Sequence, residues 1–98
     1  MLAAYLFYQV FSYFSAPRLV ISSPEPNAIV RQSDLEVRGK SDADSTVFVN
    51  GDLVALDREG NFQTKVSLFP GENKISVEAV SRRGQKTEIS RTVERESL

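Results

Sequence analysis

Hydrophobic and polar positions divide this chain into two unlike parts. The first sixteen residues carry no charged side chain and include six of the nine aromatic residues, whereas all twelve basic and thirteen acidic residues lie from Arg18 onward. Beyond Pro17, apolar residues alternate with polar ones at a period of two, which is typical of half-buried strands. The pattern predicts a hydrophobic helix over residues 1–17 and a β-domain over residues 18–98.

Turn signals separate the alternating runs. Asn50-Gly51 lies between two apolar runs and predicts a two-residue hairpin loop, because both residue types adopt positive φ readily. Pro70-Gly71 favours a type II turn, in which proline fixes the first central φ and glycine accepts a positive second one. Further turns are expected at residues 57–61 and 82–85. About seven short strands between such turns predict an all-β, immunoglobulin-like antiparallel β-sandwich.

One face of each predicted strand is apolar and should point into the space between the two sheets. Phe48 falls between two inward-facing valines and should therefore point outward. Phe69 precedes Pro70-Gly71 and is expected to cap one end of the core. The core positions that the alternation predicts are Val37, Val47, Val49, Leu56, Phe62, Val66, Leu68, Ile75, Val77 and Ile89.

The N-terminal segment is interpreted as a membrane anchor. Sixteen helical residues extend about 24 Å, less than the roughly 30 Å of a hydrocarbon core, so we expect Met1 to lie inside a longer transmembrane helix. A cleaved signal peptide is disfavoured, because no basic residue lies near Met1 and Pro17 follows the only suitable cleavage site, at Ala16. A helix lying on the β-domain or in the membrane interface is a further alternative, which the lack of a charged face disfavours.

Two interpretations remain for the polar and aromatic residues of this segment. Tyr13 and Phe14 fit an interfacial belt at headgroup depth, with Arg18 just outside the bilayer. Alternatively, hydroxyl groups at helical spacing form a face that pairs with another helix in lipid. That face would consist of Tyr5, Tyr8, Ser12 and Ser15.

Composition excludes several functional classes. The formal net charge is −1, with basic and acidic residues intermixed, so no long-range field attracts nucleic acid. The chain has no Cys and no His, which removes thiol nucleophiles, disulfides, the usual general base and the nitrogen or thiolate metal ligands. We therefore predict no catalytic residue, no metal site and no cofactor, and the module is not expected to be an enzyme.

Carboxylate pairs are the remaining candidates for chemistry. Asp42 with Asp44, and Asp57 with Glu59, offer oxygen atoms to a glycosidase mechanism or to a calcium ion. Both pairs fall in predicted turns, where acidic residues are ordinary, and residues 57–61 lack the closing bidentate Glu of a calcium loop. Turn formation is the preferred interpretation of both pairs.

Several short motifs succeed one another in a characteristic order. They are Gly39, then residues 47–51, 56–62 and 68–75, and finally Ala79. Together they resemble the bacterial immunoglobulin-like domain typified by domain B of glucodextranase, whose pattern runs Gly, Val-x-Val-Asn-Gly, Val-Asp-x-x-Gly-x-Phe and Leu-x-x-Gly-x-Asn-x-Ile. The resemblance extends over residues 19–93, with Leu56 in place of one family Val.

The resemblance implies an extracytoplasmic accessory module, defined by its fold rather than by a shared ligand, and supplies no catalytic residues. We therefore expect a membrane-anchored, non-catalytic module with a structural, spacer or protein-interaction role at the bacterial cell envelope. Its expected partners are membrane lipid, through residues 1–17, and an envelope protein or glycan. In the alternative hypothesis the module binds carbohydrate or peptidoglycan through Phe48, Arg82 and Arg83.

Overall fold

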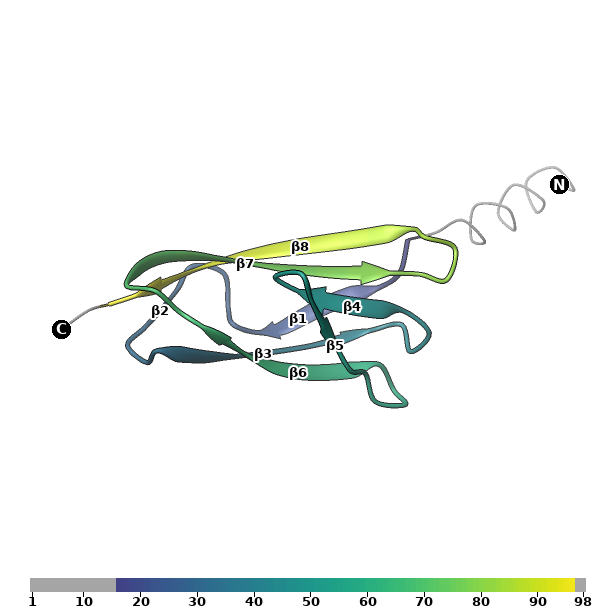
Figure 1. Cartoon of the computed structure of the whole chain (residues 1–98), viewed down its shortest axis with the longest axis horizontal. Helices are drawn as coiled ribbons and strands as arrows, with labels where there is room; N and C mark the ends of the chain where they lie inside the picture. The colour runs from purple at the N-terminus through teal and green to yellow at the C-terminus, as the bar shows by residue number, and fades with distance from the viewer. Residues whose placement is uncertain (1–15, 97–98) are drawn as a thin grey trace, which may run out of the picture.

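Residues 16–96 are described by a computed structural model and form two packed β-sheets (Figure 1). The predicted hydrophobic helix lies outside the described residues, except for Ala16 and Pro17, which belong to no helix or strand. Within residues 16–96, no helix has the length and apolar character needed to cross a membrane. The membrane segment therefore stays a prediction.

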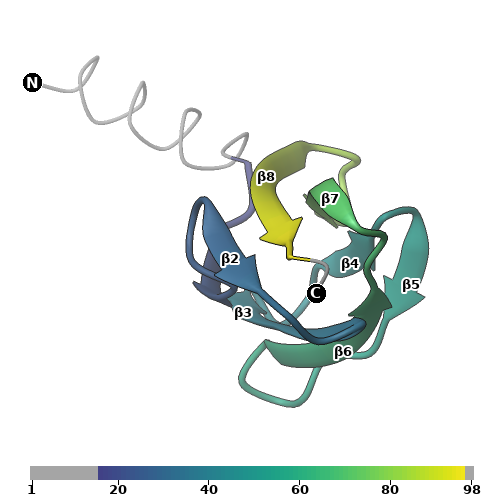
Figure 2. The same ribbon diagram turned by 90° about the vertical axis from the view of Figure 1, so that its left-hand side faces the viewer.

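Eight strands build the two sheets, which Figure 2 shows nearly end-on. One sheet has the order β1-β3-β6 and the other the order β2-β8-β7-β4-β5. This arrangement confirms the predicted immunoglobulin-like sandwich. The strands are β1 (Leu19–Ser23), β2 (Ala28–Val30), β3 (Asp34–Ser41), β4 (Thr46–Val49), β5 (Asp52–Val54), β6 (Asn61–Ser67), β7 (Gly71–Val80) and β8 (Lys86–Arg95).

The prediction of a purely antiparallel sandwich is wrong at one pair of strands. β2 runs parallel to β8, with Ala28 opposite Val93, whereas the other strand pairs are antiparallel. The physical reason is that the chain changes sheets between β1 and β2, where Pro24 is buried and cannot donate a ladder hydrogen bond. As a result, β1 is an edge strand of one sheet and β2 is an edge strand of the other.

The core lies between the sheets and agrees closely with the predicted alternation. Seven of the ten predicted positions are buried, and Leu56, Val66 and Ile89 pack against the core while partly exposed. Leu56 lies in the loop after β5, and Ile89 lies on a part of β8 that β2 does not cover, since β2 pairs only with residues 93–95. The buried hydrophobic residues outside the predicted core list are Leu19, Ile21, Leu35, Val54, Ala79 and Val93.

The predicted Asn50-Gly51 hairpin loop is confirmed. Asn50 has φ 51° and Gly51 has φ 84°, so both residues adopt the positive values that a two-residue hairpin turn requires. The Asn50 N–H donates to the Ser76 carbonyl at 2.8 Å, and the Asn50 Oδ1 accepts from the Ser76 N–H at 2.9 Å. These two bonds fasten the β4–β5 hairpin to β7.

The chain enters and leaves the sandwich at opposite ends, which we call the entry pole and the exit pole (Figure 1). At the entry pole, the buried Pro17 accepts a hydrogen bond through its carbonyl from the Thr87 hydroxyl at 2.6 Å. At the exit pole, the Glu96 N–H donates to the Val30 carbonyl at 2.8 Å. Because β8 connects the two poles with ten residues, they lie about 30 Å apart.

Candidate functional site

The three residues predicted to form a contact surface lie in two separate elements. Phe48 is half-buried on β4, where it faces outward between Leu53 of β5 and Glu78 of β7. Its outward direction agrees with the alternation, because Val47 and Val49 are both buried. The cross-strand neighbour Leu53 is 70 % exposed, so Phe48 belongs to a small apolar area on the outer face of the larger sheet.

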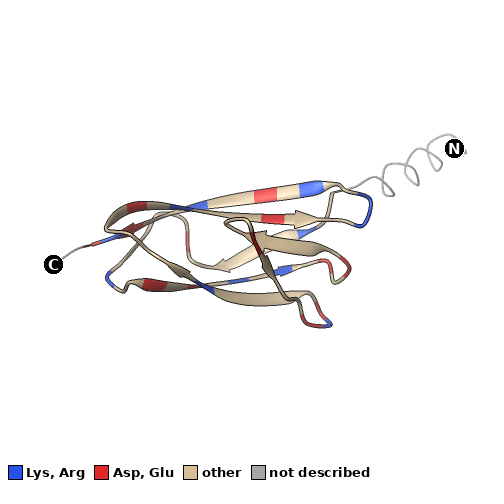
Figure 3. Cartoon of the chain, viewed as in Figure 1, with Lys and Arg blue, Asp and Glu red and all other residues tan. Residues whose placement is uncertain are grey.

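Arg82 and Arg83 occupy the exposed β7–β8 loop at the entry pole, where Figure 3 shows a basic corner. Ser81 closes this loop, since its N–H donates to the Gln85 carbonyl at 2.8 Å and its Oγ accepts from the Gln85 N–H at 3.1 Å. Phe48 lies opposite Glu78, four residues before Arg82, which corresponds to about 13 Å along the strand. The structure thus places the arginines together but Phe48 apart from them, and their shared role stays a prediction.

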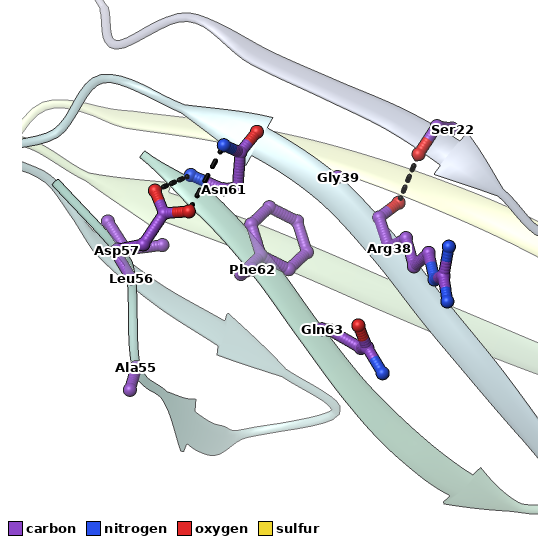
Figure 4. Close-up of a pocket in the computed structure, with 9 residues that line it drawn as sticks. All are labelled: Ser22, Arg38, Gly39, Ala55, Leu56, Asp57, Asn61, Phe62 and Gln63. Atoms are coloured by element: carbon purple, nitrogen blue, oxygen red, sulfur yellow. Dashed lines mark hydrogen bonds between the residues drawn. The ribbon is translucent and has the colours of Figure 1, made fainter. Parts of the chain in front are cut away.

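A pocket of about 440 Å³ lies at the side of the smaller sheet (Figure 4). Its aromatic wall is the buried Phe62, which stands opposite Gly39 in the β3–β6 pair. A Cβ at Gly39 would lie 2.5 Å from the Phe62 ring and 2.4 Å from the Val20 carbonyl oxygen, so this packing requires glycine. The pocket is lined by Ser22, Arg38, Gly39, Ala55, Leu56, Asp57, Asn61, Phe62 and Gln63.

The carboxylate of Asp57, one of the residues that line this pocket, stabilises a turn. Asp57 Oδ1 accepts hydrogen bonds from the backbone N–H groups of Glu59 and Asn61, both at 2.9 Å, and Oδ2 accepts from the Asn61 side chain at 3.1 Å. Both oxygens are thus engaged in the turn itself, which supports turn formation over the calcium alternative. Residues 16–96 contain no group of three or more acidic side chains placed to hold a metal ion.

These hydrogen bonds give Asp57 a pH-dependent role. The Asn61 backbone N–H is the main cause that lowers the pKa of Asp57 below its ordinary 3.8, and the Asn61 side chain is the second. A lowered folded-state pKa stabilises the fold above the ordinary pKa, and this contribution is lost as the pH falls through the folded-state pKa. The effect should be small, because the carboxylate is exposed to solvent.

We therefore expect wild type to melt above an Asp57→Asn variant at neutral pH, with the difference shrinking as the pH falls below the ordinary pKa of 3.8. Thermal unfolding followed by circular dichroism across this pH range measures the difference. A gap in melting temperature that stays constant down to the lowest pH would contradict the role of the charged carboxylate.

Phe69 does not lie where the sequence pattern predicts it. Its side chain is 77 % exposed and does not cap the core. Asn73 determines the local geometry, because its Oδ1 accepts from the Phe69 N–H at 2.9 Å and its Nδ2 donates to the Phe69 carbonyl at 2.8 Å. The same Nδ2 also donates to the Gly71 carbonyl at 3.1 Å. The β6–β7 turn therefore holds the Phe69 backbone rigidly and leaves the ring outside.

Comparison with solved structures shows the same fold in parts of several other proteins. The fibronectin(III)-like modules of Clostridium thermocellum CbhA match with a TM-score of 0.60 and 18% identity, covering 83% of this chain and 47% of that one. A modular endo-β-1,4-mannanase from Cellulomonas fimi matches with a TM-score of 0.60 and 20% identity, covering 81% of this chain and 18% of that one. At these identities the likeness shows the fold alone.

A third solved structure, SGBP-B from the Bacteroides ovatus mixed-linkage glucan utilization locus, was determined in complex with a mixed-linkage heptasaccharide. It matches with a TM-score of 0.52 and 20% identity, covering 86% of this chain and 25% of that one. This chain therefore spans less than half the length of each of these three chains.

No curated protein matches the chain. The sequence model of the family described as "Glucodextranase, domain B" matches residues 17–96, which is most of the chain and nearly the whole of the part that the structure describes. This protein therefore belongs to the glucodextranase domain B family.

Proposed function

We propose that the sandwich is a non-catalytic accessory module of the bacterial cell envelope, anchored in the membrane by residues 1–17 and positioned outside the cytoplasm. Its role in this proposal is structural: the module acts as a spacer or as a surface for another envelope protein. The uncharged, aromatic N-terminal segment supports the anchor, and membership of the glucodextranase domain B family supports the accessory role.

The observation that carries the spacer role is the placement of Pro17 and Glu96 at opposite poles. Groups attached at the entry pole and at the exit pole are held apart by the length of the body, about 30 Å. The β7–β8 ladder spans this distance with ten paired residues on each strand, so the connection between the poles is stiff. A rigid connection of this kind suits a spacer better than a flexible linker does.

Membrane attachment and sidedness are testable together, because the chain has no cysteine. A Glu96→Cys variant of the full chain introduces one thiol at the exit pole. In bacterial spheroplasts we expect the protein in the membrane fraction and its thiol labelled by a membrane-impermeant maleimide before lysis. Labelling that requires lysis would contradict the extracytoplasmic position, and recovery in the soluble fraction would contradict the anchor.

Binding of carbohydrate or peptidoglycan is a second candidate function. The family takes its name from a domain of a glucodextranase, and two of the matching structures are a mannanase and a protein solved with an oligosaccharide. Pull-down of the full chain with peptidoglycan sacculi, together with a glycan array, tests this candidate. Specific retention favours the binding function, whereas an absence of retention favours the structural role alone.

A further inference from the structure

Two adjoining depressions form a groove beside β6, where that strand is the edge of its sheet. Their volumes are about 250 Å³ and 300 Å³, and both are lined by Asn50, Val66 and Ser67. The first depression extends to Phe69 at the exit pole, and the second extends to β5, which is the edge strand of the other sheet. We call the two together the Phe69 groove.

The polar side chains of the Phe69 groove have no net charge. Glu72 and Lys74 lie at its Phe69 end, and Asp52 and Lys65 lie at its β5 end, so two ammonium groups balance two carboxylates. A charged ligand would be repelled by one side chain of like charge at either end of the groove. An uncharged ligand with many hydroxyl groups would find both acceptors and donors along the groove.

Phe69 presents an exposed aromatic ring at one end of the groove. Its neighbour Leu68 is held on both sides, because the Leu68 N–H donates to the Ser33 carbonyl at 2.7 Å and Arg95 Nη1 donates to the Leu68 carbonyl at 3.1 Å. Together with the Asn73 bonds, these contacts anchor the backbone beneath the exposed ring. Because the backbone beneath the ring is already ordered, only the side-chain torsions of Phe69 lose freedom when the ring binds a flat apolar surface.

We propose that the Phe69 groove binds a neutral glycan chain. One sugar ring stacks its C–H face on Phe69, and the hydroxyl groups of that ring and the next form hydrogen bonds with Glu72, Lys74 and Ser67. The inference rests on the carbohydrate-binding form of the proposed function and gives it a site remote from Arg82 and Arg83. It does not depend on the membrane anchor.

Native affinity electrophoresis of the full chain in mild detergent tests this inference, in separate gels that contain dextran, mixed-linkage β-glucan or galactomannan. We expect retardation in at least one of these gels, and we expect Phe69→Ala to weaken the apparent affinity about tenfold. Leu53→Ala is the matched control, because it truncates another highly exposed apolar side chain outside the groove. It should migrate like wild type, as should Phe48→Ala.

Three results would overturn the inference. If retardation persists in Phe69→Ala, the glycan does not stack on the Phe69 ring. If Phe48→Ala abolishes retardation while Phe69→Ala does not, the carbohydrate-binding function stands but its site lies on the outer face of the larger sheet. If none of the three polysaccharides retards wild type, the groove does not bind these neutral glycans, and an extended peptide along the β6 edge becomes the better ligand.

Discussion

Replacing Gly60 by alanine is expected to lower the free energy of unfolding by about 3–5 kcal/mol. Gly60 has φ +88°, a left-handed conformation that alone costs an alanine about 1–2 kcal/mol. In addition, the new Cβ would lie 1.9 Å from the carbonyl oxygen of Ser41, which is a backbone atom at the end of β3. The turn cannot move away freely, because the Ser41 N–H donates to the Gly60 carbonyl at 2.9 Å. Urea unfolding monitored by circular dichroism measures the loss.

Gly84→Ala is the matched control for this substitution. Gly84 has φ +83°, nearly the same backbone conformation, but a Cβ there would meet no heavy atom within 4 Å. This variant should therefore lose only the conformational part, about 1–2 kcal/mol. Equal losses at the two glycines would show that Gly60 is not packed against Ser41 as the structure has it.

Local sequence signals predicted the turns and most of the core. Asn50-Gly51 forms its hairpin because the conformations it needs are properties of those two residues, whatever surrounds them. The period-two alternation likewise predicts which face of a strand is apolar, and seven of the ten expected positions are buried. Short-range chemistry was sufficient for both features.

The features that the sequence could not predict depend on how distant strands are arranged in the fold. The parallel pairing of β2 with β8 joins residues more than sixty positions apart, and no local pattern indicates it. Ile89 is partly exposed because β2 pairs only with residues 93–95 of β8, which leaves Ile89 at the edge of the sheet. Alternation identifies an apolar face, but the neighbouring strands determine how completely that face is covered.

The same limit applies to the candidate site. Phe69 is exposed because Asn73 bonds both its N–H and its carbonyl across the turn, which is a geometry that appears only when the β6–β7 turn is formed. The signal in the sequence was the Asn of the Leu-x-x-Gly-x-Asn-x-Ile pattern, which indicates a turn with specific side-chain bonding. Phe48 was chosen as an aromatic residue that points outward from its strand, and Arg82 and Arg83 as basic residues in a loop. Only binding measurements test them.

Ile75→Ala should lower the free energy of unfolding by about 2–5 kcal/mol, because Ile75 is among the largest fully buried side chains. Ile75 lies on β7 and is 1 % exposed, so its truncation leaves a cavity enclosed by both sheets. In a domain of this size, a loss near 3 kcal/mol lowers the melting temperature by roughly 12–24 °C. Thermal unfolding by circular dichroism measures this shift.

Two matched substitutions show whether the loss of stability in Ile75→Ala comes from the buried cavity or from the removal of an isoleucine side chain at any position. Ile29→Ala removes the same atoms from a side chain that is 61 % exposed and should cost about 0.5 kcal/mol or less. Ile75→Val removes one methylene and should cost about 1 kcal/mol. If Ile29→Ala were as damaging as Ile75→Ala, the assignment of the core would be wrong. Because Phe69 is at least as exposed as Ile29, Phe69→Ala should also melt near wild type, so a loss of glycan binding in that variant would report on the groove and not on unfolding.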